Sequence, residues 1–337
     1  MPFSSREWQL AARPMGEPTP ADFAYTTVTV PDPGPGQIVV RNTWLSVDPY
    51  MRGRMNEGPS YIPQFELGET MTGSAVGVVV ASETEAIPVG TPVSHFAGWR
   101  EYALLDAAAA QTLDTTLAPA QAYLGVLGTT GLTAYAGVTD TAPVTDGDVV
   151  FVSGAAGAVG SVAGQIARKL GAAKVIGSAG GPEKARRLVE DFGFDAAIDY
   201  REGDLPAQLA KAAPEGIDVY IDNVGGDHLQ AALGAMNLRG RVALIGAISL
   251  YNATELPPGP NNLPLAIGNR INLRGMNVGD HFDLMPEYVG QAAAWLADGS
   301  LRADETIIDG IENTLAAFLS MMRGGNIGKM LVRLNHH

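Results

Sequence analysis

Residues Val149–Gly160 read VVFVSGAAGAVG, and this stretch decides the fold. The unbroken apolar run Val149–Val152 follows an acidic turn and predicts a buried parallel strand. After the glycine- and alanine-rich turn, apolar residues such as Val159 and Ile166 recur on one face of a helix. The stretch therefore predicts a buried strand, a tight turn and a helix that packs on a sheet.

The alternation of strand and helix continues after this stretch. The predicted strands are Val149–Ser153, Lys174–Ser178, Ala196–Asp199, Val219–Asp222 and Arg241–Ile245. The helices between them are predicted to end at Leu170, Val189 and Ala213. The expected fold class is therefore α/β, with a doubly wound parallel sheet.

Other predicted elements flank this sheet in the sequence. A helix over Tyr123–Thr139 is expected before it. After it we expect a stiff proline-rich loop at Leu256–Asn262. Helices at Met285–Ala297 and Ile311–Met322 and a closing strand at Lys329–Leu334 complete the chain.

Residues 1 to about 120 have a different pattern. Apolar and polar residues alternate from Phe23 to Val47 around a proline- and glycine-rich centre, which predicts paired strands joined by turns. Further short strands are predicted at Thr72–Val80, Pro92–Phe96 and Glu101–Leu105. This part of the chain is therefore expected to be a β-rich, barrel-like domain.

The composition excludes several classes of protein. The chain has 337 residues with 22 Lys and Arg against 36 Asp and Glu, and its formal charge of −14 argues against a nucleic-acid partner. It contains no cysteine, which excludes disulfides, thiol nucleophiles and cysteine-based zinc sites. No apolar stretch reaches the ~20 residues of a membrane helix, and no signal peptide is apparent, so we expect a cytoplasmic protein without membrane partners. His336 and His337 are typical of a purification tag and are left out of the chemistry.

The turn after the first predicted strand of the sheet has the features of a dinucleotide phosphate site. Gly157 lets a pyrophosphate approach the backbone at a helix N-terminus, where unpaired N–H groups and the helix dipole attract anions. Gly160 allows helix and sheet to pack closely, while alanine replaces the first glycine of the usual G-x-G-x-x-G pattern. A glycine-rich helix start selected for packing alone is the alternative.

The residues after the second strand indicate which nicotinamide cofactor is bound. An NAD site carries an acidic residue there for the ribose 2′-hydroxyl, whereas this chain has Ser178 and no carboxylate from Ile176 to Ala179. Lys184 near the next helix N-terminus supplies positive charge for a 2′-phosphate, and the Tyr200 hydroxyl can add a donor. NADP is therefore favoured, although Lys184 alone is equally compatible with a solvated helix residue.

Six motifs in this order resemble a known enzyme family. They are Asp48-Pro49-Tyr50-Met51-Arg52, Gly131-Leu132-Thr133-Ala134-Tyr135, Gly154-Ala155-Ala156-Gly157-Ala158-Val159-Gly160, Asp222-Asn223-Val224-Gly225-Gly226, Gly246-Ala247-Ile248-Ser249 with Tyr251-Asn252, and Asn326-Ile327-Gly328-Lys329. The chain resembles the zinc-independent medium-chain dehydrogenase/reductases over nearly its whole length. It is most similar to the NADP-dependent alkenal and enone double-bond reductases, the group that contains prostaglandin, plant alkenal and curcumin reductases.

The resemblance implies two domains with the active site in the cleft between them. A GroES-like catalytic domain is expected over 1–122, completed by 301–335, and a Rossmann NADP-binding domain over 123–300. Family members tend to dimerise through the sheet edges of the cofactor domain, so a homodimer is expected. Zinc-dependent relatives use cysteine and a Gly-His-Glu turn, whereas this chain reads Leu67-Gly68-Glu69. No metal is therefore expected, and His95 is interpreted as a structural histidine.

The resemblance also implies a set of cofactor contacts. Those expected at the pyrophosphate are Gly157, Ala158, Val159 and Gly160. Those expected at the 2′-phosphate end are Lys184 and Tyr200, with Ser178 beside them. Those expected around the nicotinamide half are Asn223, Ile245, Gly246, Ala247, Ile248, Ser249, Tyr251, Met276, Asn277, Val278 and Asn326. The family usually has an aromatic residue where Met276 stands and an apolar one at Asn277, so a more polar floor is expected here.

Without a metal, a thiol or paired carboxylates, the remaining chemistry is hydride transfer from the cofactor, with the protein supplying orientation and polarisation. Hydride addition to the β-carbon of an α,β-unsaturated ketone or aldehyde leaves an enolate oxygen that needs hydrogen-bond donors. Tyr50 and Tyr251 are the candidate catalytic residues, because a phenol with a pKa near ~10 stays protonated at neutral pH. Alternatively, each tyrosine serves only in packing.

The sequence favours an NADP-dependent oxidoreductase acting on CH–CH bonds, with a small α,β-unsaturated carbonyl substrate, and leaves two other functions open. An NADPH quinone oxidoreductase would have the same fold and glycine turn, although the Tyr50 motif and Tyr251 argue against it. A non-catalytic NADPH-binding protein would share the fold and the cofactor site, because neither makes a catalyst by itself.

Overall fold

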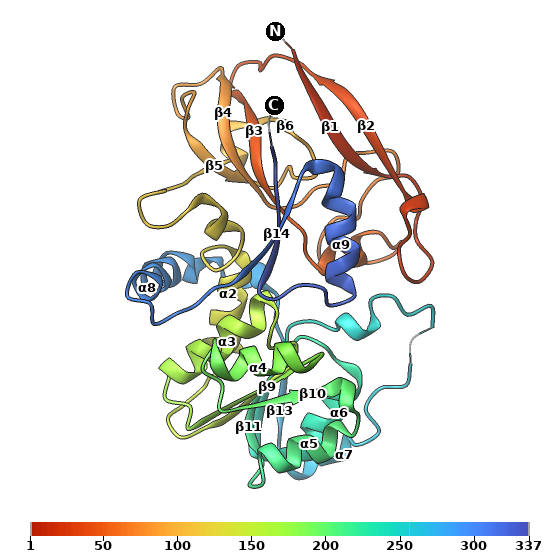
Figure 1. Ribbon diagram of the computed structural model, residues 1–337, viewed down its shortest axis with the longest axis vertical. Coiled ribbons are helices and arrows are strands. Elements are labelled where there is room, and N and C mark those ends of the chain that lie inside the picture. Colours follow the sequence, from red (N-terminus) through yellow and green to blue (C-terminus); the bar gives the residue numbers. More distant parts are fainter. Residues whose placement is uncertain (1, 256, 336–337) are drawn as a thin grey trace. The chain divides into compact units, whose positions relative to one another are not determined.

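The structure is a computed structural model that describes residues 2–255 and 257–335 (Figure 1). Leu256, the first residue of the predicted proline-rich loop, and the terminal pair His336 and His337 lie outside these ranges. The rest of that loop, residues 257–262, contains neither helix nor strand, as predicted. No helix within the described ranges has the length and apolar character needed to cross a membrane.

The chain divides into two compact units. The first, called here the β-rich unit, comprises the residues up to Leu124, Glu305–Asn326 and the residues from Met330 onward. The second, called here the parallel-sheet unit, comprises Gly125–Asp304 and Ile327–Lys329.

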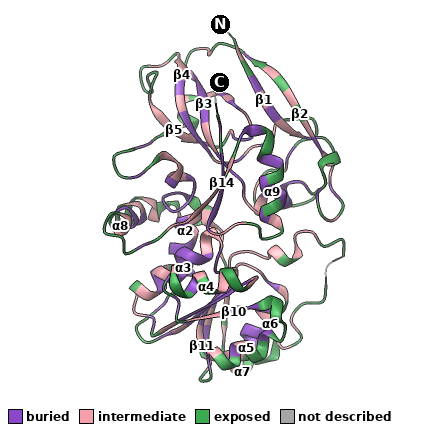
Figure 2. Cartoon of the chain, in the orientation of Figure 1, coloured by how far each residue is buried: buried purple, intermediate pink, exposed green. Residues whose placement is uncertain are grey.

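The parallel-sheet unit is built on a six-stranded sheet in the order β10-β9-β8-β11-β12-β13. Its strands are β8 Val149–Val152, β9 Lys174–Ala179, β10 Ala196–Asp199, β11 Ile217–Asp222, β12 Met236–Leu244 and β13 Asn272–Gly275. Every neighbouring pair is parallel, and β11 is buried at each position except Asp218 (Figure 2). The strand order runs outward in both directions from the centre, so the carboxyl ends of β8 and β11 form the switch point where such sheets bind ligands. The predicted doubly wound parallel sheet is confirmed.

Helices and short turns connect these strands. The helices are α2 Thr129–Ala136, α3 Ala158–Lys169, α4 Pro182–Glu190, α5 Leu205–Ala212, α6 Gly226–Ala235, α7 Pro264–Gly268 and α8 Met285–Ala297. The short turns are η4 Gly137–Thr141, η5 Tyr200–Glu202, η6 Ile248–Leu250 and η7 Val278–Leu284. In the core of the sheet, the Phe151 and Tyr220 rings stack with their centroids 5.1 Å apart.

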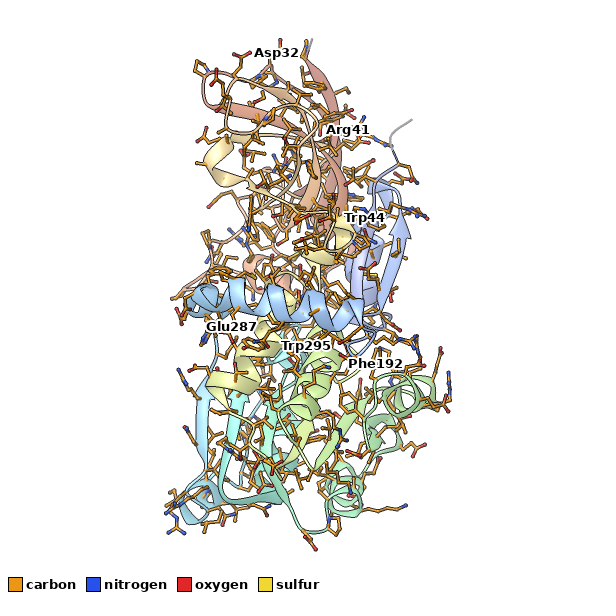
Figure 3. All side chains as sticks on the ribbon, turned by 90° about the vertical axis from the view of Figure 1, so that its left-hand side faces the viewer. Asp32, Arg41, Trp44, Phe192, Glu287 and Trp295 are labelled. Atoms are coloured by element: carbon orange, nitrogen blue, oxygen red, sulfur yellow. The ribbon has the colours of Figure 1, made fainter. Side chains whose placement is uncertain are left out.

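Helix α8 has the predicted bounds and is fastened to its neighbours by side chains of both its ends (Figure 3). The Glu287 carboxylate accepts a hydrogen bond from Tyr135 Oη of α2 at 2.9 Å. Near the other end, Lys169 Nζ of α3 lies 5.0 Å from the centre of the Trp295 ring. The amphipathic helix therefore packs beside α2 and α3, as its sequence requires.

The predicted helix over Tyr123–Thr139 is wrong in its extent. The structure has a 3₁₀ turn, η3 Ala120–Leu124, and α2 begins only at Thr129. Gly125 and Gly128 lie between them, and glycine disfavours a helix interior because its backbone has more freedom to lose. The helical path then continues through the wider turn η4.

The β-rich unit contains a two-stranded and a seven-stranded sheet. The larger sheet has the order β14-β15-β3-β4-β5-β7, with β6 also paired to β3. The strands of the unit are β1 Phe3–Leu10, β2 Phe23–Val30, β3 Gln37–Ser46, β4 Ala75–Ser82, β5 Pro92–His95, β6 Tyr102–Asp106, β7 Gln111–Thr112, β14 Glu305–Asp309 and β15 Lys329–Arg333. Its helices and turns are η1 Pro20–Asp22, α1 Tyr50–Arg54, η2 Ala107–Ala109, η3, η8 Ile311–Asn313 and α9 Thr314–Met322. Leu331 pairs with Ser46, so the tail of the chain is part of this sheet.

The predicted pairing within Phe23–Val47 is wrong. Strand β2 pairs antiparallel with β1, in a register that places Phe3 opposite Val30, while β3 lies in the larger sheet. The segment between β2 and β3 contains three prolines, which cannot form a two-residue hairpin turn of the kind that pairs neighbouring strands. Strand β1 was not predicted, because polar Ser5 and Glu7 occupy two of its three buried positions in place of apolar residues.

Candidate functional site

The phosphate turn lies between β8 and α3. Gly157 is the N-cap of α3, and Ala158 to Gly160 form its first turn. Within the described residues no side chain caps this helix start, so its N–H groups are available to an anion. A Cβ atom on Gly160 would lie 2.6 Å from the carbonyl oxygen of Gly154 and 2.7 Å from Cα of Ala155. Glycine is therefore required where the helix meets the turn.

A second segment braces this turn from the other end of the chain. The Gly328 N–H donates to the carbonyl oxygen of Ala156 at 2.8 Å, which forms a bridge between Gly157 and Gly328. Gly328 has a φ of +66°, and a Cβ atom on it would lie 1.9 Å from the carbonyl oxygen of Asp304. The glycine of the Asn326–Lys329 motif is therefore required for the close approach of three backbone segments.

The predicted cofactor contacts of the parallel-sheet unit all follow the carboxyl ends of its strands. Each group begins within two residues of a strand end or on the helix that follows it. In strand order from β10 to β13, these contacts are Tyr200, Ser178 with Lys184, Gly157 to Gly160, Asn223, Ile245 to Ser249 with Tyr251, and Met276 to Val278. Tyr50 and Asn326 belong to the β-rich unit.

The ends of β9 and β10 carry a group of polar side chains. Ser178 is fully buried at the end of β9, and within the described residues its hydroxyl has no hydrogen-bond partner. Lys184 lies in the first turns of α4, where burial and then the positive charge of Arg201 lower its pKa. Tyr200 follows β10, and its hydroxyl lies 2.7 Å from the position that a Cβ atom would take on Gly180. These groups offer hydroxyl donors and positive charge to an anion.

The loops after β9 and β10 are tied together by a carboxylate. Asp199 Oδ1 accepts hydrogen bonds from the Gly181 N–H at 2.8 Å and from the Arg201 N–H at 3.0 Å. Arg201 could not be recognised from the sequence, because an arginine in a short turn indicates no function until its neighbours in space are known.

The end of β11 is organised by the buried carboxylate of Asp222. Its Oδ1 accepts hydrogen bonds from Tyr220 Oη at 2.7 Å and from the backbone N–H groups of Val224 and Gly225 at 3.0 and 2.8 Å. Ser153 Oγ adds a fourth contact at 3.2 Å. All four partners are donors, so this one oxygen ties the end of β11 to the turn that follows it and to the end of β8. The sequence offered one signal for Asp222, an acid at the end of the predicted strand Val219–Asp222.

Asn223 and the segment after β12 are hydrogen-bonded to residues at the carboxyl ends of β8 and β11. The Asn223 side-chain amide donates to the carbonyl oxygen of Ser153 at 2.8 Å. The N–H groups of Ile245 and Gly246 both donate to the Asp222 carbonyl oxygen, at 2.9 and 3.0 Å. Ser249 Oγ donates to the Val224 carbonyl oxygen at 2.6 Å. Of the predicted nicotinamide-side contacts, Asn223, Ile245, Gly246 and Ser249 are therefore brought together around the end of β11.

Tyr251 lies directly after the turn η6 and is half-buried. Its hydroxyl oxygen accepts a long hydrogen bond of 3.5 Å from the Ala247 N–H. Burial raises the pKa of Tyr251, so the phenol keeps its proton at neutral pH. Because the hydroxyl acts here as an acceptor, its own proton is available to a ligand.

The contacts of the residues after β13 explain why a polar residue, Asn277, stands where the family usually has an apolar one. The Met276 N–H donates to the Leu244 carbonyl oxygen at 3.0 Å, which extends the edge of the sheet. Asn277 Oδ1 accepts from the Gly279 N–H at 3.0 Å and caps the turn η7, which begins at Val278. The polar side chain at this position therefore stabilises a turn.

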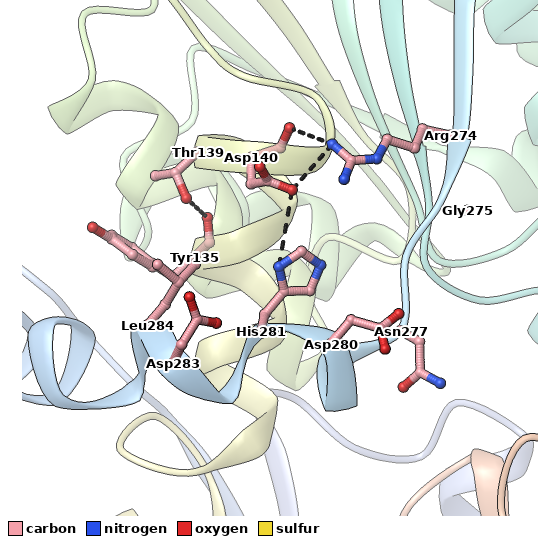
Figure 4. A pocket seen from close by; sticks show the side chains of 10 residues that line it. All are labelled: Tyr135, Thr139, Asp140, Arg274, Gly275, Asn277, Asp280, His281, Asp283 and Leu284. Atoms are coloured by element: carbon pink, nitrogen blue, oxygen red, sulfur yellow. Dashed lines mark hydrogen bonds and ion pairs between the residues drawn. The ribbon is translucent and has the colours of Figure 1, made fainter.

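A polar pocket of about 530 Å³ lies beside this turn (Figure 4). It is lined by Tyr135, Thr139, Asp140, Arg274, Gly275, Asn277, Asp280, His281, Asp283 and Leu284. Arg274 and Asp140 form an ion pair at 3.0 Å, and His281 Nδ1 lies 3.9 Å from the same carboxylate. Among the predicted site residues it contains Asn277 alone.

Tyr50 begins helix α1 in the β-rich unit and packs against the core that contains Met51 and Trp99. Its hydroxyl is buried and has no hydrogen-bond partner among the described residues. Burial raises the pKa of Tyr50 well above its usual value, and the charge of Asp48 raises it further. The phenol therefore stays protonated, and its donor is unused within the unit.

The arginines around Tyr50 serve as structural braces. Arg52 is buried and donates from Nη2 to the carbonyl oxygen of Gly16 at 2.7 Å. Arg54 is also buried, donates to the carbonyl oxygens of Pro63 and Thr72 at 2.7 and 2.8 Å, and lies over the Phe65 ring. The arginines therefore tie the loops on either side to α1.

His95 is a satisfied structural histidine, as predicted. Its Nε2 lies 2.8 Å from Asn42 Oδ1, and its Nδ1 accepts from the Ala97 N–H at 3.0 Å. Burial lowers the pKa of His95 to about 4, so the ring is neutral. Within residues 2–255 and 257–335, no cluster of three or more His, Cys, Asp or Glu side chains is arranged to hold a metal ion.

Two protein families match separate parts of the chain. The N-terminal domain of oxidoreductase matches residues 6–113, and the zinc-binding dehydrogenase family matches residues 158–298. The first match covers most of the β-rich unit, and the second covers the parallel-sheet unit from the first residue of α3 to the end of α8.

Known enzymes are similar to the chain over nearly its full length. The NADPH-dependent curcumin reductase of Escherichia coli (strain K12) is 39% identical, over 98% of this chain and 97% of that protein. The chain belongs to the medium-chain dehydrogenase/reductase family. Within this family, the NADP⁺-dependent 2-alkenal reductase of Nicotiana tabacum is 40% identical over 95% and 94% of the two chains. The crystal structure of CurA from Vibrio vulnificus in complex with NADPH is 38% identical, with a TM-score of 0.93 over 98% of this chain and 100% of that chain. The predicted resemblance is confirmed.

Proposed function

We propose that this protein is an NADPH-dependent reductase of the carbon–carbon double bond in α,β-unsaturated ketones and aldehydes. The names of its curcumin and alkenal reductase relatives support this reaction class. The observation that carries the proposal is the Tyr251 hydroxyl. It keeps its proton, uses its oxygen as an acceptor and lies after the strand whose carboxyl end borders the switch point of the sheet.

The residues of the parallel-sheet unit fit an NADPH molecule. The uncapped helix start at Gly157 would hold the pyrophosphate, and Asn223 would lie beside the nicotinamide half. The buried, unpartnered hydroxyl of Ser178, together with Lys184 and Tyr200, would hold the 2′-phosphate. When it is bound, NADPH supplies the hydride.

The tyrosines would act on the carbonyl oxygen of the substrate. When hydride adds to the β-carbon, the electrons of the double bond move toward the carbonyl and negative charge develops on its oxygen. Tyr251 would donate its phenolic proton as a hydrogen bond to that oxygen, and Tyr50 is the second candidate donor. The α-carbon then takes a proton from solvent, which gives the saturated carbonyl compound. The protein supplies position and a hydrogen bond, and no covalent intermediate with the chain is needed.

A panel of acceptors followed at 340 nm tests the reaction class. We expect NADPH oxidation that depends on an α,β-unsaturated ketone or aldehyde and yields the saturated carbonyl product by mass spectrometry. Oxidation that depends on a quinone alone would point to a quinone oxidoreductase. Tight binding of NADPH without turnover of either acceptor would point to a cofactor-binding protein that is not a catalyst.

We also propose that the protein forms a homodimer through strand β13. This strand pairs with β12 on one side, and within the described residues no strand covers its other side. An exposed edge strand offers unpaired backbone groups to a second copy. Light scattering is expected to give twice the 35.2 kDa of one chain, and a mass of one chain would contradict the dimer.

A further inference from the structure

Arg201 is an exposed arginine whose guanidinium lies on bare glycine backbone. Its Nε lies 2.9 Å from the position that a Cβ atom would take on Gly180, and its Nη1 lies 3.8 Å from the same position on Gly181. Among residues 2–255 and 257–335, its guanidinium has no carboxylate or carbonyl partner, since its one hydrogen bond, to Asp199, comes from the backbone N–H. The side chain is thus placed by the turn η5 and not by an ion pair.

Two arginines of α4, the helix that contains Lys184, form ion pairs instead. Arg186 is paired with Glu190, and Arg187 is paired with Asp191 at 2.6 Å. Arg201, by contrast, lies close enough to Lys184 for its charge to lower the pKa of that lysine. Glu183 acts on the pKa of Lys184 in the opposite sense, so part of the repulsion between the two cations is already compensated. Two cations held near each other are suited to an anionic ligand that carries more than one negative charge.

Two hydroxyl groups, those of Tyr200 and Ser178, add hydrogen-bond donors to the candidate anion site, called here the cradle. The Tyr200 hydroxyl and Arg201 Nε lie 2.7 and 2.9 Å from the same Cβ position on Gly180, so a side chain there would fill the space between them. The buried Ser178 hydroxyl, two residues earlier, has no partner in the described part of the chain. A phosphate monoester, with a charge near −2 and three acceptor oxygens, matches two cations and two hydroxyl donors.

We propose that Arg201 is the second cation of the 2′-phosphate site and that it shares with Lys184 the selection of NADPH over NADH. The inference rests on the proposed function, because it assigns this cradle to the cofactor. A guanidinium can form two parallel hydrogen bonds to phosphate, whereas an ammonium acts as a point charge. Arg201 is therefore expected to contribute at least as much to the selection as Lys184.

A different role for Arg201 would leave a different signature. A flat guanidinium can also stack on the adenine ring, and adenine is common to both cofactors. Stacking would make the loss of Arg201 weaken NADPH and NADH equally. Contact with the phosphate would weaken only ligands that carry the 2′-phosphate.

Equilibrium titration by calorimetry tests the inference without any turnover. The ligands are NADPH, NADH, 2′,5′-ADP and 5′-AMP, and the variants are Arg201→Gln, Lys184→Gln and the control Arg186→Gln, an exposed arginine paired with Glu190. We expect Arg201→Gln to weaken NADPH and 2′,5′-ADP by about tenfold or more and to leave NADH and 5′-AMP within about twofold. The control is expected to leave all four affinities unchanged, and circular dichroism checks that each variant is folded.

Two results would overturn the inference, and a third would contradict the proposed function. An unchanged ratio of NADPH to NADH affinity in folded Arg201→Gln would remove Arg201 from the phosphate site. Equal losses for all four ligands would assign it to adenine stacking. A parent protein that binds neither dinucleotide would instead contradict the proposed function itself. Arg201→Lys separates charge from geometry, because it keeps the charge and is expected to recover only part of the affinity.

Discussion

The residues that follow β11 and β12 and those that follow β9 and β10 lie toward opposite ends of the sheet's carboxyl edge, and their polar groups have different kinds of partner. After β11 and β12, Asp222 accepts four hydrogen bonds, and Asn223 is tied to Ser153, so these side chains hold the backbone in shape. After β9 and β10, the Ser178 hydroxyl and the Arg201 guanidinium have no such partners in the described residues. We therefore propose that the end at β11 and β12 provides the fixed geometry that hydride transfer requires, and that the end at β9 and β10 recognises charge.

The phosphate turn lies between these two ends and should serve both cofactors alike. Gly157→Val is expected to abolish the binding of NADPH and of NADH, because the branched side chain would occupy the place where the pyrophosphate approaches the backbone. The measurement is a titration of the folded variant with each cofactor. Gly290→Val is the matched control, since Gly290 is an exposed residue of α8 with open space at its Cβ position. Normal binding by a folded Gly157→Val protein would mean that the turn has been misread.

A substitution of Asp222 tests the role of the hydrogen bonds at the end of β11. Asp222→Asn is expected to lower the free energy of unfolding by about 1.5–3 kcal/mol, because hydrogen bonds to a buried charged group are weakened. Urea denaturation measures this loss, with the exposed Asp227→Asn as the control. The ratio of NADPH to NADH affinity should stay as in the parent protein. A change in that ratio would show that the two ends are not separate in function.

A substitution of Lys184 tests the proposed charge recognition at the ends of β9 and β10. Lys184→Ala is expected to weaken NADPH by about tenfold or more and to leave NADH nearly unchanged, because it removes one charge-assisted contact to phosphate. The free energy of unfolding should change little. The exposed Lys211→Ala on α5 controls for the loss of a positive charge elsewhere. Equal weakening of both cofactors would contradict the assignment of Lys184 to the 2′-phosphate.

The elements of the fold that depend on a local sequence pattern could be predicted from the sequence. The apolar run of β8, the turn at Gly157 and the helix α8 follow from periodicity and turn chemistry, and the structure contains each of them. The pairing of β1 with β2 could not be predicted, since Ser5 and Glu7 hide the apolar face of β1. Such pairing depends on the rest of the sheet and not on the strand itself.

The roles of Asp222 and Arg201 could not be predicted for a related reason. Each is defined by what surrounds it in space: four donors around the carboxylate, and bare glycine backbone beside the guanidinium. A single sequence contains the residue types but not these contacts. By contrast, the sequence indicates Lys184 and Tyr200 as candidates, because one lies near a predicted helix N-terminus and the other directly after a predicted strand, and their roles stay predictions.

The central claim is that the Tyr251 phenol stabilises the enolate oxygen as hydride arrives. Single-turnover reduction of an enone by the parent protein and by Tyr251→Phe, with hydride transfer limiting, tests it most directly. We predict that the rate falls on the order of tenfold while the enone dissociation constant stays nearly unchanged, because the hydroxyl acts on the transition state and Tyr50 is the second donor that we propose. Parental rates in Tyr251→Phe, in Tyr50→Phe and in the double variant would contradict the claim and leave polarisation to the cofactor and backbone donors.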